Sequence, residues 1–213
     1  MSIAVKICGL NDAASVAAAV EGRADFIGFV FFPASPRCVE PETSARLGAR
    51  VPKTIVKVGL VVDADDATLG RIVARSKVDM LQLHGEESPA RAAEIRARFG
   101  LPVMKAILVE TAADVDKARG FEPAVDRLMF DARPPKDATR RGGNALPFDW
   151  TLLKGRAFAK PWLLAGGLSA ANVAEAVRAS GAKAVDVSSG VEVAPGRKSA
   201  EKILEFLRVA TAL

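Results

Sequence analysis

Short apolar segments recur along the chain, and longer segments of mixed polar and apolar residues separate them. Eight of these segments are apolar on both sides, as expected for strands buried on both faces of a parallel sheet. We therefore predict strands at Ile3–Cys8, Phe26–Phe32, Ile55–Val62, Met80–Leu83, Val103–Ile107, Arg127–Phe130, Trp162–Ala165 and Ala184–Val187.

Helical patterns lie between the predicted strands, and several begin with a capping signal. Asp12 is placed to cap the first helix, and Ser88 with Pro89 opens another helix that Gly100 ends. The predicted helices are Asp12–Val20, Glu42–Arg50, Asp65–Arg75, Ser88–Phe99, Thr111–Arg119, Asp149–Lys154, Ala170–Ala179 and Ser199–Thr211. The segment Asp149–Lys154 is the shortest of them.

Eight strands that alternate with eight helices form either an open sheet or a closed barrel, and this number of repeats favours closure. We expect an α/β fold, a single (β/α)8 TIM barrel with a closed parallel eight-stranded sheet. No linker or composition break divides the 213 residues, so one domain is expected over 1–213. The long basic segment Asp131–Pro147 would follow the sixth strand on the catalytic face.

Composition and charge narrow the range of partners. A net charge of +5 suits a small anionic substrate, whereas dispersed charges and the absence of tyrosine argue against nucleic acid. No segment is long enough for a membrane span, and the N-terminus lacks a signal peptide's apolar stretch. Two cysteines, Cys8 and Cys38, do not make a disulfide framework. We expect a cytoplasmic protein without membrane contact, a monomer with a homodimer as the alternative.

Glycine-containing segments follow the last two predicted strands. Gly166 and Gly167 end the seventh, and Ser188, Ser189 and Gly190 end the eighth. Glycine lets backbone N–H groups approach an anion closely, and a helix start after each loop adds a favourable dipole. Either segment alone indicates only a turn. Together they predict a phosphate site, since barrels frequently hold phosphate between these two loops.

Two further strand ends carry groups that move protons. Cys8 ends the first strand, and Asp131 follows the apolar part of the sixth. A cysteine accepts protons as the thiolate, which nearby cations, Arg37 among them, would favour. An aspartic acid donates a proton near neutral pH only in an apolar setting that favours its protonated form. The alternatives are a structural cysteine and a helix-terminal charge, but the strand-end position favours function.

Three more residues are candidates for substrate binding. Arg37 lies in a loop framed by Pro33 and Pro36, and its bidentate fork suits a planar carboxylate. His84 is the only histidine and is expected to line the site rather than to perform the chemistry. Asp186, near the end of the eighth strand, points either into the barrel mouth or into a helix interface.

The sequence predicts neither a metal nor a cofactor. One histidine and two separated cysteines show no zinc-ligand spacing. The chain also lacks the glycine-rich motifs that bind dinucleotides or ATP. A small phosphorylated molecule is therefore the expected ligand.

A series of motifs resembles the phosphoribosylanthranilate isomerase family of tryptophan biosynthesis. The motifs are Lys6–Gly9, Pro33–Arg37, Leu81–Gly85, Phe130–Asp131, Gly142–Gly143, Phe148–Trp150, Leu164–Leu168, Val185–Glu192 and Pro195–Lys198. They follow the family's order over almost the whole chain, and the first motif and the strand-eight motif are specific. One departure is that Asn144–Pro147 follows Gly142–Gly143, where the family commonly has another glycine.

The resemblance implies an Amadori rearrangement of N-(5-phosphoribosyl)anthranilate to 1-(o-carboxyphenylamino)-1-deoxyribulose 5-phosphate. It implies that Asp131 protonates the ribose ring oxygen and that Cys8 removes the proton from C2. Arg37 would face the anthranilate carboxylate, Asp186 would orient the anthranilate end, and His84 would line the pocket. No cofactor is implied, because the protonated imine nitrogen of the substrate serves as the electron sink.

Two other functions compete with this interpretation. A histidine-pathway isomerase performs the same rearrangement on a larger, bis-phosphorylated substrate. Such barrels resemble this one at both phosphate loops, but they use a pair of aspartates, with Asp at the position of Cys8. A non-catalytic phosphate-binding barrel would have a disrupted acid or base, whereas Cys8 and Asp131 are both present. Both alternatives are therefore less favoured than the isomerase.

Overall fold

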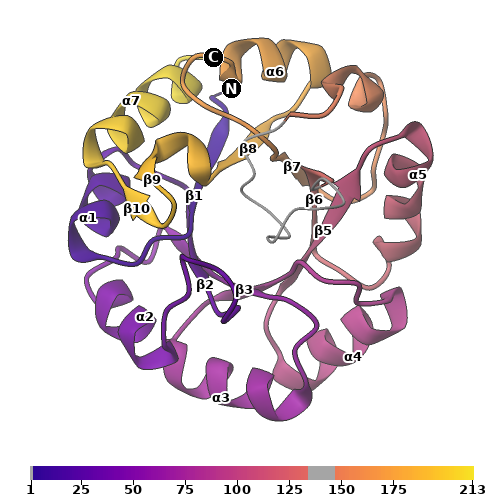
Figure 1. Ribbon diagram of the computed structural model, residues 1–213. Helices are drawn as coiled ribbons and strands as arrows, with labels where there is room; N and C mark the ends of the chain where they lie inside the picture. The colour runs from indigo at the N-terminus through magenta and orange to yellow at the C-terminus, as the bar shows by residue number, and fades with distance from the viewer. Residues whose placement is uncertain (1, 134–146) are drawn as a thin grey trace.

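The computed structural model describes residues 2–133 and 147–213. Eight parallel strands close into a barrel in chain order, and helices surround it (Figure 1). The strands are β1 (Ala4–Cys8), β2 (Phe26–Val30), β3 (Val56–Val61), β4 (Met80–Leu83), β5 (Val103–Val109), β6 (Arg127–Ala132), β7 (Trp162–Leu164) and β8 (Ala184–Val187). The predicted closed barrel is confirmed, and each predicted strand is present to within two residues at either end.

Seven α-helices lie among the described residues, and local capping explains where most of them begin. They are α1 (Ala13–Glu21), α2 (Pro41–Gly48), α3 (Asp66–Ser76), α4 (Pro89–Phe99), α5 (Ala112–Phe121), α6 (Val173–Ser180) and α7 (Ala200–Thr211). The side chains of Asp12, Asp65, Ser88 and Ser199 each accept a backbone N–H at a helix start. Gly100 ends α4 in the left-handed conformation, as predicted.

The prediction of the sixth helix along the chain is wrong. The segment Asp149–Lys154 forms a short 3₁₀-helix, η1 (Trp150–Leu153), in place of an α-helix. Asp149 caps it by accepting the N–H of Thr151 at 3.0 Å. A segment this short completes barely more than one α-helical turn, and the costly nucleation of an α-helix is not recovered over that length.

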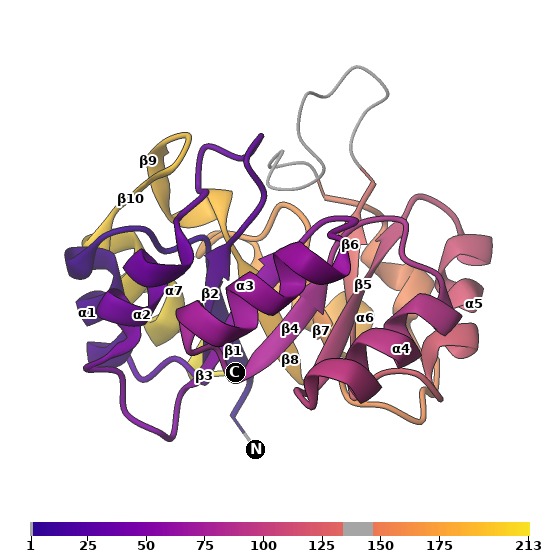
Figure 2. The ribbon, with the colours of Figure 1, turned by 90° about the horizontal axis from the view of Figure 1, so that it is seen from below.

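A hairpin after β8 is the largest element that the apolar pattern does not predict. The 3₁₀-helix η2 (Ser189–Val191) leads into β9 (Glu192–Ala194) and β10 (Arg197–Lys198), an antiparallel pair outside the barrel. Pro195 and Gly196 form the turn, and Gly196 takes a positive φ of 78°. In the side view the N-terminus lies at one end of the barrel and this hairpin rises at the other (Figure 2).

Two apolar cores result from the alternation of side chains along the strands. The larger core lies between the sheet and the helices and contains Ile7, Phe29 and Phe130. The smaller core fills the barrel interior with residues such as Met104 and Met129. Polar inward-facing side chains follow this plug toward the carboxyl ends of the strands, where TIM-barrel active sites form.

Two further predictions, the long segment after the sixth strand and the absence of a membrane span, concern residues that the structure describes only in part. Of the segment Asp131–Pro147, residues 134–146, with Gly142–Gly143, lie outside the described residues. Within residues 2–133 and 147–213, no helix is both long and apolar enough to cross a membrane.

Candidate active site

A hollow of about 580 Å³, partly open to solvent, lies at the carboxyl ends of the strands. Its lining includes six residues predicted from the sequence, which are Cys8, Arg37, His84, Asp131, Asp186 and Ser188. These residues lie in or directly after four strands, β1, β4, β6 and β8, and in the loop after β2, so only barrel closure brings them together. The pocket therefore lies where the ends of the predicted strands indicate it.

Asp186 points into the barrel mouth, which decides between its two predicted orientations. Asp186 and Ser188 follow Ala184, which belongs to the interior core, at the two-residue spacing that keeps side chains on one face of a strand. The Asp186 carboxylate accepts a hydrogen bond from Lys6 Nζ at 2.7 Å. A buried ion pair that the sequence pattern does not predict thus joins Asp186, which lines the pocket, to Lys6.

Cys8 lies beside this ion pair and is itself buried. Burial raises the pKa of the Cys8 thiol, the Lys6 ammonium opposes the rise, and the Asp186 carboxylate adds to it. The direction is opposite to the depressed thiol pKa that the sequence argument required. Lys6, rather than Arg37, is the cation that acts most strongly on the thiol.

Asp131 is held from two sides at the opposite part of the pocket. Its Oδ1 accepts the N–H of Ala132 at 2.8 Å, and its Oδ2 lies 3.2 Å from Nε2 of His84. Gln82 Nε2 lies 3.0 Å from Nδ1 of His84. With the amide nitrogen donating to Nδ1, the ring proton is on Nε2, which lies near the carboxylate but makes no hydrogen bond within the described residues. His84 therefore lies beside the predicted acid.

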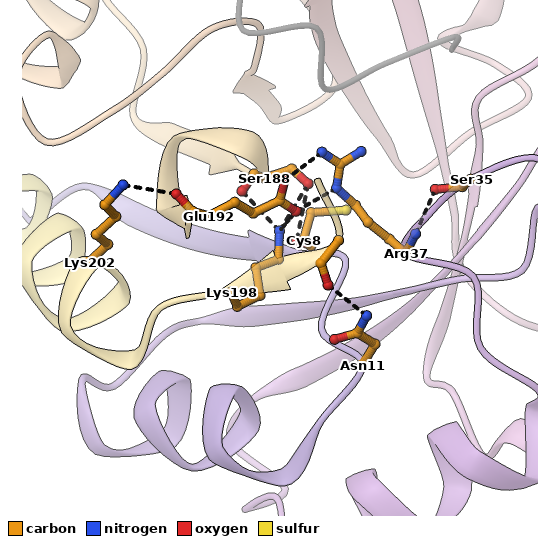
Figure 3. A network of polar contacts seen from close by, with 9 residues as sticks. Cys8, Asn11, Ser35, Arg37, Ser188, Glu192, Lys198 and Lys202 are labelled. Carbon is orange, nitrogen blue, oxygen red and sulfur yellow. Dashed lines mark hydrogen bonds and ion pairs between the residues drawn. The ribbon is translucent and has the colours of Figure 1, made fainter. Parts of the chain in front are cut away.

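Arg37 is buried and its fork is already engaged within the protein (Figure 3). Its Nε donates to Glu192 Oε1 at 2.7 Å, and its Nη2 donates to Oε2 at 2.8 Å. Burial opposes ionisation of Glu192, but the hydrogen bond from Arg37 and the charge of Lys198 outweigh it and lower the pKa of that carboxyl. The edge of the guanidinium formed by Nη1 and Nη2 is the one not directed at Glu192.

The β9–β10 hairpin is tied to the pocket by Lys198 (Figure 3). Lys198 Nζ donates to Glu192 Oε1 at 2.8 Å and to the Ser188 carbonyl at 2.9 Å. Ser188 Oγ in turn donates to the carbonyl of Cys8 at 3.2 Å. The network connects Cys8, the end of β8 and the hairpin, and through Glu192 it fixes Arg37.

The glycines predicted to bind phosphate lie together on the other side of the pocket. A hollow of about 290 Å³ is lined by residues of both loops, including Gly166, Gly167, Ser188 and Ser189. Gly166 and Gly167 have φ values of 88° and 66°, which glycine adopts without strain. A Cβ on Gly190 would lie 1.9 Å from the carbonyl oxygen of Leu168, so the two loops touch at that glycine.

The helix starts around this hollow differ from expectation on one side. The loop after β7 leads into α6, whereas the loop after β8 leads into the 3₁₀-helix η2 and then the hairpin. Any dipole contribution from a full α-helix therefore comes from α6 alone. Among the described residues, no group of three or more His, Cys, Asp and Glu side chains is arranged to hold a metal ion.

Lys6, Gln82, Glu192 and Lys198 are site residues that the sequence argument did not select. Lys6, Glu192 and Lys198 stand within the motifs quoted above, but a charged residue in a motif does not reveal its partner. Lys6 and Asp186 are 180 residues apart, and Arg37 and Glu192 are 155 apart. The available signal was the period of two along β1 and β4, which puts Lys6 on the face of Cys8 and Gln82 on the face of His84.

The sequence matches a family model and known proteins over nearly its whole length. The model for "N-(5'phosphoribosyl)anthranilate (PRA) isomerase" matches residues 5–209. The N-(5'-phosphoribosyl)anthranilate isomerase of Paramagnetospirillum magneticum is 54% identical over 210 residues, 99% of this chain and 98% of that protein. The protein of the same name from Paracoccus denitrificans is 55% identical and covers 100% of this chain and 99% of its own length.

Solved structures of phosphoribosyl anthranilate isomerases are also similar to this chain over nearly its whole length. Phosphoribosyl anthranilate isomerase from Thermotoga maritima superimposes with a TM-score of 0.88 at 32% identity, covering 99% of this chain and 100% of its own. A structure of phosphoribosyl anthranilate isomerase in complex with reduced 1-(o-carboxyphenylamino)-1-deoxyribulose 5-phosphate gives a TM-score of 0.83 at 30% identity, with coverages of 99% of this chain and 100% of that one.

Proposed function

Because the chain belongs to the N-(5'-phosphoribosyl)anthranilate isomerase family, we propose that Asp131 and Cys8 are the general acid and general base of its reaction. That reaction converts N-(5'-phosphoribosyl)anthranilate into 1-(o-carboxyphenylamino)-1-deoxyribulose 5-phosphate in tryptophan biosynthesis. It is an Amadori rearrangement of an aminoaldose into an aminoketose. The observation that carries the proposal is that both groups line one pocket.

Asp131 begins the reaction by giving its proton to the ribose ring oxygen. The bond between that oxygen and C1 breaks, and the lone pair of the anthranilate nitrogen forms the imine. The Ala132 N–H supports this role, because it donates to Oδ1 and stabilises the carboxylate left after transfer, and His84 lies 3.2 Å from Oδ2.

Cys8 then removes the proton from C2, and the electron pair of that bond moves into the protonated imine. The enolamine that forms tautomerises as C1 gains a proton and the C2 hydroxyl becomes the ketone. A raised thiol pKa lowers the thiolate population but makes each thiolate a stronger base. The cationic imine arrives beside Cys8 only after ring opening, and its charge favours the thiolate at that stage.

Arg37 binds the anthranilate carboxylate in this proposal. Glu192 occupies the Nε side of the fork, so the carboxylate is assigned to the Nη1–Nη2 edge. Both edges of a guanidinium suit bidentate carboxylate binding. Asp186 orients the anthranilate end, and His84 lines the pocket beside it.

The loops after β7 and β8 hold the 5-phosphate. Gly166, Gly167, Ser188 and Ser189 line the hollow that supports this assignment, and Gly190 lets the loops approach each other. Binding a remote phosphate positions the sugar without contact to the reacting carbons. Two placed proton-transfer groups then contribute roughly 10²–10⁴-fold each.

The decisive experiment follows anthranilate fluorescence as the substrate is consumed. Cys8→Ala and Asp131→Asn are each expected to lower kcat by about 10²–10⁴-fold relative to the parent. The matched control is Cys38→Ala, which removes the other free thiol and should leave turnover near the parent value. Near-normal turnover in either pocket variant would remove that residue from its proposed role.

We also propose a cytoplasmic location and one domain spanning 1–213. Two free thiols support the first, since reducing compartments preserve them. A single closed sheet from Ala4 to Val187 supports the second. The expected state is a monomer that binds a phosphorylated small molecule, with the homodimer as the alternative that sedimentation would reveal. A structural relative from Thermotoga maritima is described as dimeric.

A further inference from the structure

Lys6 is a wholly buried cation next to the proposed base. No part of the residue is exposed to solvent, and its side chain extends from β1 into the barrel interior on the same face as Cys8. Lysine is almost never fully buried unless it is paired. The pairing with Asp186 at 2.7 Å meets that need, but it does not explain why the ammonium lies beside a thiol.

Gly28 shows how closely the ammonium and the thiol approach one position. Gly28 of β2 pairs in register with Cys8 of β1. A Cβ placed on Gly28 would lie 3.0 Å from Cys8 Sγ and 3.0 Å from Lys6 Nζ. Both polar atoms therefore converge on the space that the missing side chain leaves open, and a larger residue there would separate them.

The charged groups facing Cys8 come from β1, β8 and β10. The Lys6 ammonium and the Lys198 ammonium lower the thiol pKa, whereas burial and the Asp186 carboxylate raise it. Burial opposes the charge on Lys6, but Asp186 and Cys8 outweigh it, so the pKa of Lys6 is raised and the group stays protonated. Lys198 is shared with Glu192, which leaves Lys6 as the strongest cationic influence on the thiol.

We propose that Lys6 is a positioning residue whose ammonium stabilises the anionic form of Cys8, so that the proposed base exists as thiolate when C2 is deprotonated. Asp186 weakens this stabilisation, because its carboxylate accepts a hydrogen bond from the same ammonium. The inference rests on the proposed role of Cys8 as base. It gives the Lys6–Asp186 pair a role in the reaction in addition to any contribution to the stability of the barrel.

A second buried pair in the same barrel provides a matched control. Lys105 Nζ lies 2.7 Å from Glu87 Oε2, and both side chains are as buried as those of Lys6 and Asp186. Lys105 extends from β5 and also donates to the Gly85 carbonyl, and no thiol is among its hydrogen-bond partners in the described residues. Replacing Lys105 therefore tests what the loss of a buried lysine does to the fold without changing the surroundings of Cys8.

The test measures thiolate formation directly, without substrate. The chain contains no tyrosine, so the rise in ultraviolet absorbance on raising the pH comes from thiolates rather than phenolates. In a Cys38→Ser background, Cys8 is the one thiol left to contribute to this rise in absorbance. Lys6→Met is expected to raise the midpoint by about one pH unit or more, a roughly tenfold loss of thiolate at lower pH. Lys6→Arg retains the charge and should keep the midpoint near that of the background protein.

Asp186→Asn is expected to shift the Cys8 midpoint in the opposite direction, whereas a purely structural ion pair would give no such shift. Removing the carboxylate frees the ammonium for Cys8, so the midpoint should fall. Lys105→Met should lower thermal stability and leave the midpoint unchanged. The proposal is overturned if Lys6→Met leaves the midpoint unchanged, or if Lys105→Met shifts it equally. If Lys6→Met does not fold, an unchanged or raised midpoint in Asp186→Asn overturns the proposal.

Turnover separates this inference from the function on which it rests. If Cys8→Ala retains activity, the base assignment fails whatever the titration shows. If Cys8→Ala is inactive while Lys6→Met titrates and turns over like the background protein, only the role of Lys6 fails. Support requires that the acidic limb of the kcat/KM profile of Lys6→Met moves to higher pH together with the thiol midpoint.

Discussion

Glu192 is the anion between two buried cations, and Glu192→Gln removes its charge while preserving its shape. The side chains of Arg37 and Glu192 are each 5% exposed, and that of Lys198 is fully buried. Without the carboxylate, both cations remain in the interior without their counterion. Breaking a buried ion pair from one side costs about 3–5 kcal/mol, because the remaining charge stays desolvated.

The magnitude translates into a measurable loss of thermal stability. For a domain of this size each kcal/mol lowers Tm by about 2–4 °C, so a decrease on the order of 10 °C is expected. Urea unfolding and calorimetry at neutral pH measure the two quantities independently.

Glu42→Gln is the matched control for this prediction. Glu42 lies 2.8 Å from Arg75 Nη1, a distance close to those in the buried network, but both side chains are more than half exposed. Solvent screens exposed pairs, so little change is expected there. A loss in Glu192→Gln as small as that in Glu42→Gln would refute the claim that the hairpin holds Arg37 through a desolvated pair.

Two further predictions concern the phosphate loops and acid stability. Gly190→Ala places a Cβ against the Leu168 carbonyl and should lower kcat/KM by roughly 10–100-fold and weaken inhibition by inorganic phosphate; Gly120→Ala, which meets no atom within 4 Å, is the control, and equal effects would contradict the assignment. At Asp114, burial opposes the charge, but hydrogen bonds from Lys117 and the backbone of Thr111 lower its pKa in the folded protein. Its stabilisation is therefore complete above the unfolded pKa of about 4 and is lost as pH falls below it, so the parent should lose more unfolding free energy than Asp114→Asn on acidification.

The period of the apolar pattern predicted the strands because each strand of a closed parallel barrel is buried on both faces. Capping is equally local, so Asp12, Asp65 and Ser88 indicated their helices correctly. The segment Asp149–Lys154 has the same kind of start signal but lacks the length for an α-helix, and the capping residue alone does not reveal that.

For the site, too, local sequence signals predicted which residues are candidates, but not the contacts that they make with residues distant in the sequence. Strand ends selected Cys8 and Asp131 as candidates, because barrel topology brings strand ends together whatever their partners are. The environment of Cys8 was not predictable, since it depends on Lys6, Asp186 and the depth of burial after closure. The hairpin had a local signal in Pro195–Gly196, but its function depends on Glu192 meeting Arg37 across the fold.

The central claim is that Asp131 opens the ring and that Cys8 removes the C2 proton. The kinetic isotope effect on kcat/KM with substrate deuterated at C2 tests it most directly, because each variant slows a different step. In Cys8→Ser, proton removal limits the rate, and a full primary isotope effect is predicted. In Asp131→Asn, ring opening limits the rate, and the effect should fall to near unity. A full effect in Asp131→Asn together with none in Cys8→Ser would contradict the account.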